Sequence, residues 1–578
     1  MKGGVHMANR NKNRKTITEQ LWVRIMCGFL AVLMVLGTLF YVFATFELRA
    51  ANESAESEQE IAVGIAYGNN LLPTYTVSCD EGFDVSIVSG KNKTKAFEIN
   101  SKSISIAANN NLYKNSEGYD YDPDRVTVIG GYHVQISSYS FRIGADGSGD
   151  NPVSIFPGGS SGGSLDDLGY TYEEVIAKTK DLNESGILDS HNVYSYPVYN
   201  NGKYIIRVGN FDTFEKAQEF NVLLSESISM VSEISEPKDG SVSLIDYRTN
   251  KVLMSFFLTE KDNINVEPKN GVSFFDTYSN EYYGHVDYMY SDGKFAVINH
   301  LLLEQYLKCI LPVTVSASSN MELLKLFAVM LRTKIACNGE LHDAYGIDVC
   351  TDDHCSQYYG RRFENAAASE AVELTKGEII TYSGKAISPA YCMSAGATTV
   401  SGADVFGKEI PYLKAIQNSD TTVNEWTLTM SPSDILNALA DAGYTQITSN
   451  VSSVKINSRG DGSEYVNSIT FTDILGNELT VDGGAAINKA FAYKLPSTAF
   501  TVGKAGETVE REVYKNGELI KESITLEGVY GAFVFVGKGS GNGLGVSIQG
   551  AKDDVAAGMK YVDIISKYYR DVSITKMS

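Results

Sequence analysis

A run of 22 residues without a charged side chain, from Ile25 to Phe46, constrains this 578-residue chain more than any other feature. A helix of that length measures roughly 33 Å at about 1.5 Å per residue, which is enough to cross a bilayer. Basic residues precede the run and acidic residues follow it, which predicts a cytoplasmic tail over 1–24 and an extracytoplasmic remainder. We therefore expect a single-pass protein of the cell membrane. A cleaved secretory signal is the alternative, although its apolar core usually spans about 7–15 residues.

The charge of the chain limits its partners. The formal net charge is −21 at pH 7, and such a surface repels polyanions. Nucleic acid is therefore excluded as an expected partner, whereas a neutral polymer such as a glycan strand is compatible with this charge.

Composition divides the predicted ectodomain into segments. Residues 47–60 are polar and acidic and are predicted to form a stalk. Alternating β-branched residues over 61–143, as in Ile61–Tyr67, predict a β-rich N-terminal part. Residues 144–169 are dense in Gly, Ser and Asp, a composition typical of a linker.

The next segment, 170–260, has a strand followed by a helix. Residues 203–211 alternate like a strand, Thr213 is a candidate helix cap, and 214–224 show helical spacing of apolar residues. This pattern resembles the sporulation-related repeat (SPOR-like), a small domain that binds glycan strands stripped of their peptides. A generic β-α-β piece is the alternative.

The remaining segment, 261–578, mixes both kinds of element. Helices are predicted near 302–311 and 321–337, and strands return in the C-terminal third. The apolar residues of 321–337 nearly encircle the helix, so it is predicted to be buried, with Arg332 paired to a carboxylate or bound to backbone carbonyls. The expected fold class is α+β, with a single N-terminal transmembrane helix followed by a mostly β ectodomain with a helical layer.

Four segments, in this order, resemble motifs of the stage II sporulation protein D (SpoIID) / amidase enhancer (LytB) family. They are Asn299–Pro312 (NHLLLEQYLKCILP), Glu322–Thr333 (ELLKLFAVMLRT), Ala390–Leu413 (with AYCMSAG, DVFG and PYL) and Gly537–Ala551 (with GKGSGNGLGVS). Together they cover roughly residues 280–578. The resemblance implies a protein of a Gram-positive-type cell surface that acts on peptidoglycan. The alternating glycines of the fourth segment are interpreted either as a groove wall that lets a sugar approach or as tight sheet packing.

The resemblance also shows what is missing. Active family members are similar to lytic transglycosylases, whose Glu follows the first motif, and here Thr314 stands at that position. Asn542 stands where the family has His. No catalytic residue is therefore assigned. The candidate substrate-binding residues are Thr314, Tyr358, Ser394, Gly396, Asn542, Gly543 and Ser547.

A short loop concentrates metal-binding side chains. Cys350 and Cys355 have four residues between them, a spacing that zinc can bridge, and His342 and His354 lie beside them. Some family members resemble this arrangement and hold a structural zinc there. A Cys350–Cys355 disulfide and free thiols are the alternatives. No other cofactor is expected.

These observations predict a membrane-anchored, weakly catalytic or non-catalytic protein that binds peptidoglycan and assists cell-wall remodelling in sporulation. Its expected partners are glycan strands and a cell-wall amidase or other wall hydrolase that it stimulates. Two alternatives remain open. One is an active lytic transglycosylase that uses a carboxylate of 343–353, and the other is a surface module that binds a protein partner.

Overall fold

The computed structural model describes residues 59–577 with internal gaps. The gaps are 109–111, 116–117, 122–130, 137–168, 201, 229–231, 237–240, 259–260, 276–277, 317, 338–341, 353–354, 421–423 and 516–517. The predicted tail and span, most of the predicted stalk, and the linker apart from Gly169 therefore lie outside the described residues.

The predicted fold class needs a correction. We expected one membrane-spanning helix at 25–46 and a single-pass membrane localisation, but no helix among the described residues is long and apolar enough to cross a membrane. The longest described helix, Met321–Cys337, has 17 residues, or roughly 26 Å, against a hydrocarbon thickness of about 30 Å. It carries Arg332 and packs inside the protein. Segment 25–46 lies outside the described residues, and what the structure describes is mostly strands with some helices.

A seven-stranded sheet joins the start of the described chain to its middle. Its strand order is β19-β1-β18-β17-β14-β3-β4. The strands are β1 Glu60–Ala66, β3 Phe83–Ser89, β4 Asn92–Ile99, β14 Asp262–Pro268, β17 His285–Ser291, β18 Lys294–Leu302 and β19 Val349–Cys350. Because β1 pairs with β18 and β3 with β14, the predicted boundary at 261 runs through a continuous sheet.

A second sheet has ten strands in the order β11-β8-β10-β9-β13-β12-β5-β2-β15-β16. The strands are β2 Thr74–Ser78, β5 Ser103–Ala108, β8 Tyr132–Ile136, β9 Ser195–Asn200, β10 Lys203–Phe211, β11 Ser232–Ser235, β12 Ser241–Asp246, β13 Val252–Phe257, β15 Val272–Phe275 and β16 Asn280–Tyr283. The hairpin β6 Leu112–Asn115 and β7 Gly118–Tyr121 lies between β5 and β8 in the chain.

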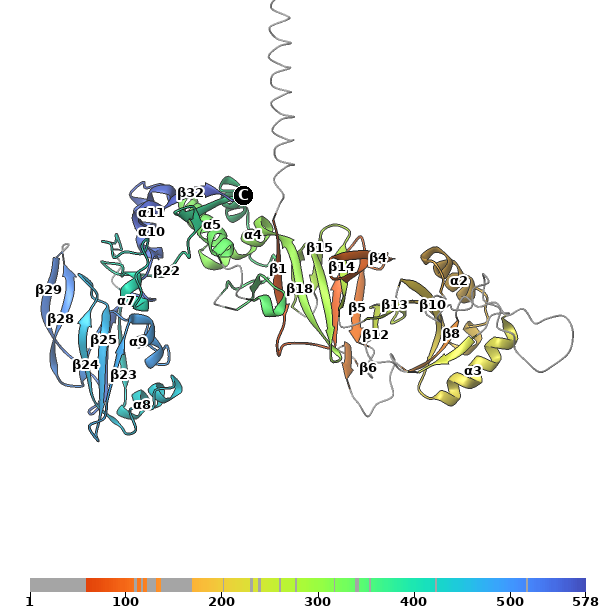
Figure 1. Cartoon of the computed structure of the whole chain (residues 1–578), viewed down its shortest axis with the longest axis horizontal. Coiled ribbons are helices and arrows are strands. Elements are labelled where there is room, and N and C mark those ends of the chain that lie inside the picture. The colour runs from red at the N-terminus through yellow and green to blue at the C-terminus, as the bar shows by residue number, and fades with distance from the viewer. Residues whose placement is uncertain are drawn as a thin grey trace, which may run out of the picture. The chain divides into compact units, whose positions relative to one another are not determined.

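One end of this sheet is a βαββαβ segment. The chain runs through β8, α2 (Tyr172–Glu184), β9, β10, α3 (Phe214–Ser227) and β11, and both helices lie against these strands (Figure 1). Residues 203–211 form the predicted strand, and Thr213 caps α3 by accepting the Lys216 N–H at 3.3 Å. The segment begins at β8, earlier than the sequence indicated.

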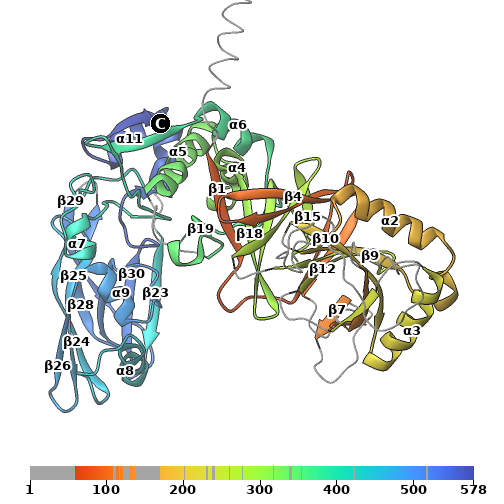
Figure 2. The ribbon, with the colours of Figure 1, turned by 45° about the vertical axis from the view of Figure 1, so that its right-hand side comes forward.

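The four family motifs and the segments next to them form a group of helices and short strands. Helices α4, α5 and α6 pack on one another (Figure 2). Helices α10 and α11 also pack on α5. The helices are α4 Leu303–Thr314, α5 Met321–Cys337, α6 Ala366–Leu374, α7 Gly402–Phe406, α10 Ile548–Ala556 and α11 Tyr561–Tyr568. The strands are β20 Glu378–Tyr382, β21 Lys385–Ala386, β22 Tyr391–Cys392, β31 Val546–Ser547 and β32 Ser573–Lys576. The predicted helix over 321–337 is confirmed.

Residues 425–538 form a β-rich part with its own hydrophobic core, which includes Phe471, Phe491 and Phe535. Its strands are β23 Glu425–Met430, β24 Val451–Arg459, β25 Val466–Asp473, β26 Glu478–Asp482, β27 Phe500–Lys504, β28 Thr508–Lys515, β29 Glu518–Thr525 and β30 Phe533–Lys538. Its helices are α8 Pro432–Asp441 and α9 Gly484–Ala490. In the chain this part follows the third motif, and its last strand, β30, runs into the first two residues of the fourth.

A buried ion pair fixes the helical group. The side chain of Arg332 on α5 has no exposed surface, and its Nε and one terminal nitrogen donate to the Glu304 carboxylate of α4 at 2.9 and 2.7 Å. The same guanidinium donates to the carbonyls of Glu378 and Val372 at 3.1 and 3.4 Å. Arg332 therefore pairs with a carboxylate and also binds backbone carbonyls, so both predicted roles are confirmed.

Arg332→Met should lower the free energy of unfolding by about 3–5 kcal/mol, because it leaves the Glu304 carboxylate without its buried partner. Arg332→Lys should recover only part of this loss, since an ammonium cannot make the bidentate contact. Urea denaturation followed by circular dichroism measures both changes.

The exposed ion pair between Lys93 and Glu267, 2.8 Å apart, is the matched control. Lys93→Met should cost less than about 1 kcal/mol, because water screens this pair. Equal losses in the two methionine variants would contradict the central role of Arg332.

Candidate functional site

Thr314 ends helix α4, at the position where the resemblance places the family's acid. Its hydroxyl donates to the Ile310 carbonyl one turn earlier, at 3.1 Å. A groove of about 480 Å³ begins two residues further on, and its described lining holds no carboxylate. The lining residues are Ser316, Ser318, Ser319, Asn320, Leu323, Lys552, Val555 and Ala556. Thr314 can therefore form hydrogen bonds, but neither its hydroxyl nor the described lining of the groove supplies a carboxylic acid.

The glycine-rich segment packs against the protein itself. Strand β31 pairs in parallel with β22. A Cβ atom at Gly543 would lie 2.4 Å from the Tyr465 ring, and one at Gly545 would lie 2.0 Å from the Ala390 carbonyl oxygen. Both glycines have positive φ, at 72° and 70°, a conformation that other residues rarely adopt. Of the two interpretations of these glycines, tight packing fits the contacts at both positions.

Ser394 and Ser547 meet at a carboxylate that the sequence analysis did not single out. Ser394 Oγ donates to Asp420 Oδ2 at 2.5 Å, and Ser547 Oγ lies 3.4 Å from the same oxygen. Ser547 Oγ also accepts the N–H groups of Ala395 and Gly550, both at 3.2 Å, and so caps α10. The only indication of Asp420 in the sequence was its position, as an acidic residue soon after the third motif.

The other candidate substrate-binding residues have separate environments. Gly396 offers its carbonyl to the Asn418 side chain at 2.8 Å, beside the serines. Asn542 is exposed, and its side-chain oxygen accepts the Leu544 N–H at 3.1 Å, which stabilises a turn. Tyr358 is buried, and its hydroxyl donates to Asn299 at 2.8 Å. The structure thus brings Ser394, Gly396 and Ser547 together and places Tyr358 in the core.

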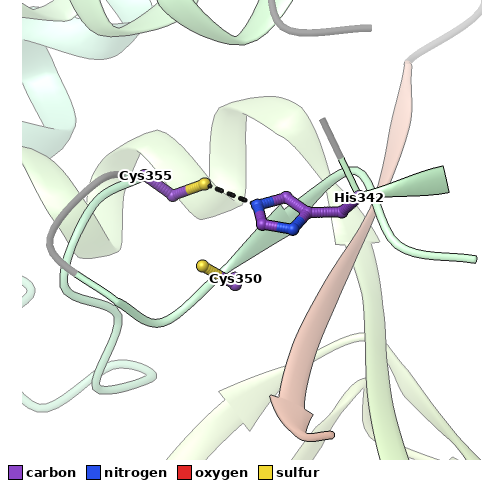
Figure 3. A group of neighbouring side chains, drawn as sticks. All are labelled: His342, Cys350 and Cys355. Carbon is purple, nitrogen blue, oxygen red and sulfur yellow. Dashed lines mark hydrogen bonds between the residues drawn. The ribbon is translucent and has the colours of Figure 1, made fainter. Parts of the chain in front are cut away.

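His342, Cys350 and Cys355 form a buried cluster. One ligand atom from each lies within 4.8 Å of the others, and His342 Nε2 is 3.1 Å from Cys355 Sγ. In Figure 3 the imidazole and the two sulfur atoms point toward one another. Neither cysteine is joined in a disulfide, so the structure contains no Cys350–Cys355 bridge. His354, the fourth predicted ligand, lies outside the described residues.

The surroundings of this cluster suit a metal bound by sulfur. The Asp352 N–H points to Cys350 Sγ at 3.4 Å, and the Lys334 ammonium donates to the Cys355 carbonyl. Burial raises the pKa of the Cys355 thiol to about 11, which by itself favours the neutral thiol over the thiolate. One imidazole and two thiols are donors that zinc prefers, and zinc binds thiols as thiolates, so the residues present fit a zinc ion.

Two acids of the same loop hold strand β1. Asp348 accepts the Ala62 N–H at 2.7 Å, and Asp352 accepts the hydroxyl of Tyr67. Both carboxylates therefore attach the loop to the seven-stranded sheet. Asp353, a further acid of 343–353, lies outside the described residues.

Comparison with known proteins agrees with these features. Residues 291–382, which contain α4, α5 and the cysteine loop, match the family model of the stage II sporulation protein SpoIID. An uncharacterised protein of Brachyspira hyodysenteriae is 28% identical over 303 residues, covering 51% of this chain and 72% of that protein.

The amidase enhancer of Bacillus subtilis is 27% identical over 291 residues. That match covers 46% of this chain and 40% of the amidase enhancer, so more than half of the relative lies outside it. The SpoIID family model and the amidase enhancer together support a role of this chain in sporulation and the cell wall. The matched SpoIID domain and the homology to the amidase enhancer support the predicted resemblance to the SpoIID/LytB family.

Proposed function

We propose that this protein binds peptidoglycan glycan strands and assists cell-wall remodelling in sporulation without cutting the strands itself. The observation that carries the proposal is the state of Thr314. Glycan cleavage needs a carboxyl group that protonates the leaving oxygen, and a threonine hydroxyl is far too weak an acid. Here that hydroxyl donates to the Ile310 carbonyl. Loss of a general acid/base typically lowers the rate by about 10²–10⁴.

Asp420 is the carboxylate that the structure places among the candidate residues. Its Oδ2 accepts the Ser394 hydroxyl at 2.5 Å and lies beside Ser547, which caps α10. These bonds tie the third motif to the fourth. They support a structural role for Asp420, which links two loops, rather than the role of an acid poised for proton transfer.

Glycan binding is assigned to the βαββαβ segment, whose element order supports its resemblance to the sporulation-related repeat. A groove of about 500 Å³ lies between α2 and β9. Aromatic and apolar groups, including Tyr194 and Ile176, share its wall with polar groups such as Asn192. Sugars present both apolar ring faces and hydroxyls, so a wall of this composition suits them.

The contribution to remodelling is the stimulation of a separate hydrolase. The relative from Bacillus subtilis is named an amidase enhancer. A protein that holds glycan strands can raise the local concentration of an amidase on its substrate, because a second binding contact makes the encounter intramolecular. A cell-wall amidase is therefore the proposed partner.

Incubated with sacculi stripped of peptides, the purified full-length chain should sediment with them and release no anhydro-muropeptides. Sedimentation followed by mass spectrometry of the supernatant measures both outcomes. Anhydro products from the wild type, lost in Asp420→Asn, would overturn the non-catalytic proposal and identify the acid. Failure to sediment would instead favour a surface module that binds a protein partner.

Ile176→Glu should weaken sedimentation at least tenfold, because it places a charged group on the groove wall. Val222→Glu is the control, since Val222 is exposed on α3 of the same segment and is not part of that lining. Similar binding by the two variants would exclude this groove as the glycan site.

A structural zinc at His342, Cys350 and Cys355 completes the proposal. The ion would hold the loop, and these residues would bind it while the Asp352 N–H and Lys334 support the sulfur ligands. The chemistry that the ion supplies is cross-linking of the chain, and no reaction step is assigned to it.

Cys355→Ser should remove the zinc that survives dialysis and lower the midpoint of thermal unfolding, because a ligand bound only by the folded state stabilises that state. Elemental analysis and a thermal melt measure these effects. Cys337→Ser is the matched control, because Cys337 is exposed and lies outside the cluster. Zinc retained by Cys355→Ser would contradict the assignment.

A further inference from the structure

Two histidines stand opposite each other on neighbouring strands, apart from the cysteine cluster. His285 on β17 pairs directly with His300 on β18. Their rings are stacked, with centroids 5.0 Å apart and planes 9° from parallel. Side chains opposite each other in antiparallel strands lie on one face of the sheet, so both imidazoles project to the same side.

A carboxylate from the next strand joins the pair. Ala62 of β1 lies opposite His300, and Glu60, two residues earlier, projects from the same face because side chains alternate along a strand. Glu60 Oε1 is 3.7 Å from His285 Nδ1. One ligand atom from each of Glu60, His285 and His300 lies within 4.8 Å of the other two.

A second carboxylate, which is buried, lies next to one histidine of the pair. Asp287 is buried, and its Oδ2 lies 3.5 Å from His300 Nε2. Its other oxygen accepts the side-chain amide of Asn265 at 2.5 Å, which fixes the carboxylate. A histidine that binds a metal through one nitrogen commonly donates from the other to a carboxylate, and the contact with Asp287 fits that arrangement.

From this geometry we propose that Glu60, His285 and His300 form a second metal site, which binds a divalent transition-metal ion such as zinc. Imidazole nitrogens with one carboxylate oxygen suit such ions better than calcium or magnesium, which prefer oxygen ligands. Bonds of about 2.0–2.2 Å place tetrahedral ligand atoms about 3.3–3.6 Å apart. Metal binding would therefore require the stacked imidazole rings to turn so that both nitrogens face the ion, while the half-exposed Glu60 side chain moves toward them.

The site differs from the cysteine cluster in its expected chemistry. Three protein ligands leave a coordination position for water or for a group of another molecule. Both histidine side chains keep about a quarter of their surface exposed, at 23% and 24%, so that position is reachable from solvent. Metal binding at this site does not require the protein to bind glycan, and the experiment below measures metal binding alone.

Cobalt(II) titration of the metal-free full-length chain separates the two sites, because only the cysteine cluster gives thiolate-to-cobalt charge transfer. The wild type should bind two equivalents of cobalt, of which one lacks the thiolate signal. His300→Gln should lose that equivalent and keep the thiolate signal, which also reports that the variant is folded. Glu60→Gln, at the exposed end of β1, should weaken the same equivalent at least tenfold.

His191→Gln is the matched control, because His191 is an exposed histidine outside both clusters. It should bind cobalt like the wild type. A single equivalent carrying the thiolate signal, or an unchanged titration in both His300→Gln and Glu60→Gln, would overturn the proposal and leave the histidines as a stacked cross-strand pair.

Discussion

The bidentate contact between Arg332 and Glu304 is the interaction on which the family domain depends. A buried guanidinium must satisfy its donors inside the protein, and here the acceptors come from α4, from the end of α6 and from β20. The three elements are therefore fixed to α5 by one side chain. Because Thr314 ends α4, and Asn320 and Leu323 line the groove at the start of α5, the same contact sets how the groove is formed.

The contacts that hold this fold together are distinct from the group expected to act as the acid. The helix pair, the glycine-rich packing and the capping role of Ser547 are all present, whereas a hydroxyl replaces the carboxyl group at the end of α4. A fold keeps its stability when an acid at its surface is lost, because buried contacts stabilise it and the acid does not. On the proposed function, binding and recruitment would continue on a scaffold that does not cut the glycan.

The sequence predicted local features well because they depend on neighbouring residues. The helix over 321–337, the strand over 203–211 and the cap at Thr213 follow from periodicity and capping chemistry. The clustering of three candidate metal ligands followed from their short spacing. Contacts across strands were not predictable in this way. Asp420, the shared seven-stranded sheet and the pair of His285 with His300 depend on registers between distant segments.

Strand β1 lies between the strands that carry the two histidine-containing clusters, and its pairing shows how the cysteine loop is attached to the sheet. It pairs with β18, which carries His300, on one side and with β19, which carries Cys350, on the other. Strand β19 is an edge strand of two residues, too short to stay paired through its backbone alone. Gly64 opposite Cys350 leaves room for Ile347, and Asp348 holds the Ala62 N–H. These contacts attach one side of the loop. The side that carries Cys355 is held by Lys334 of α5, which donates to the Cys355 carbonyl, and the proposed metal ion would join the two sides through Cys350 and Cys355.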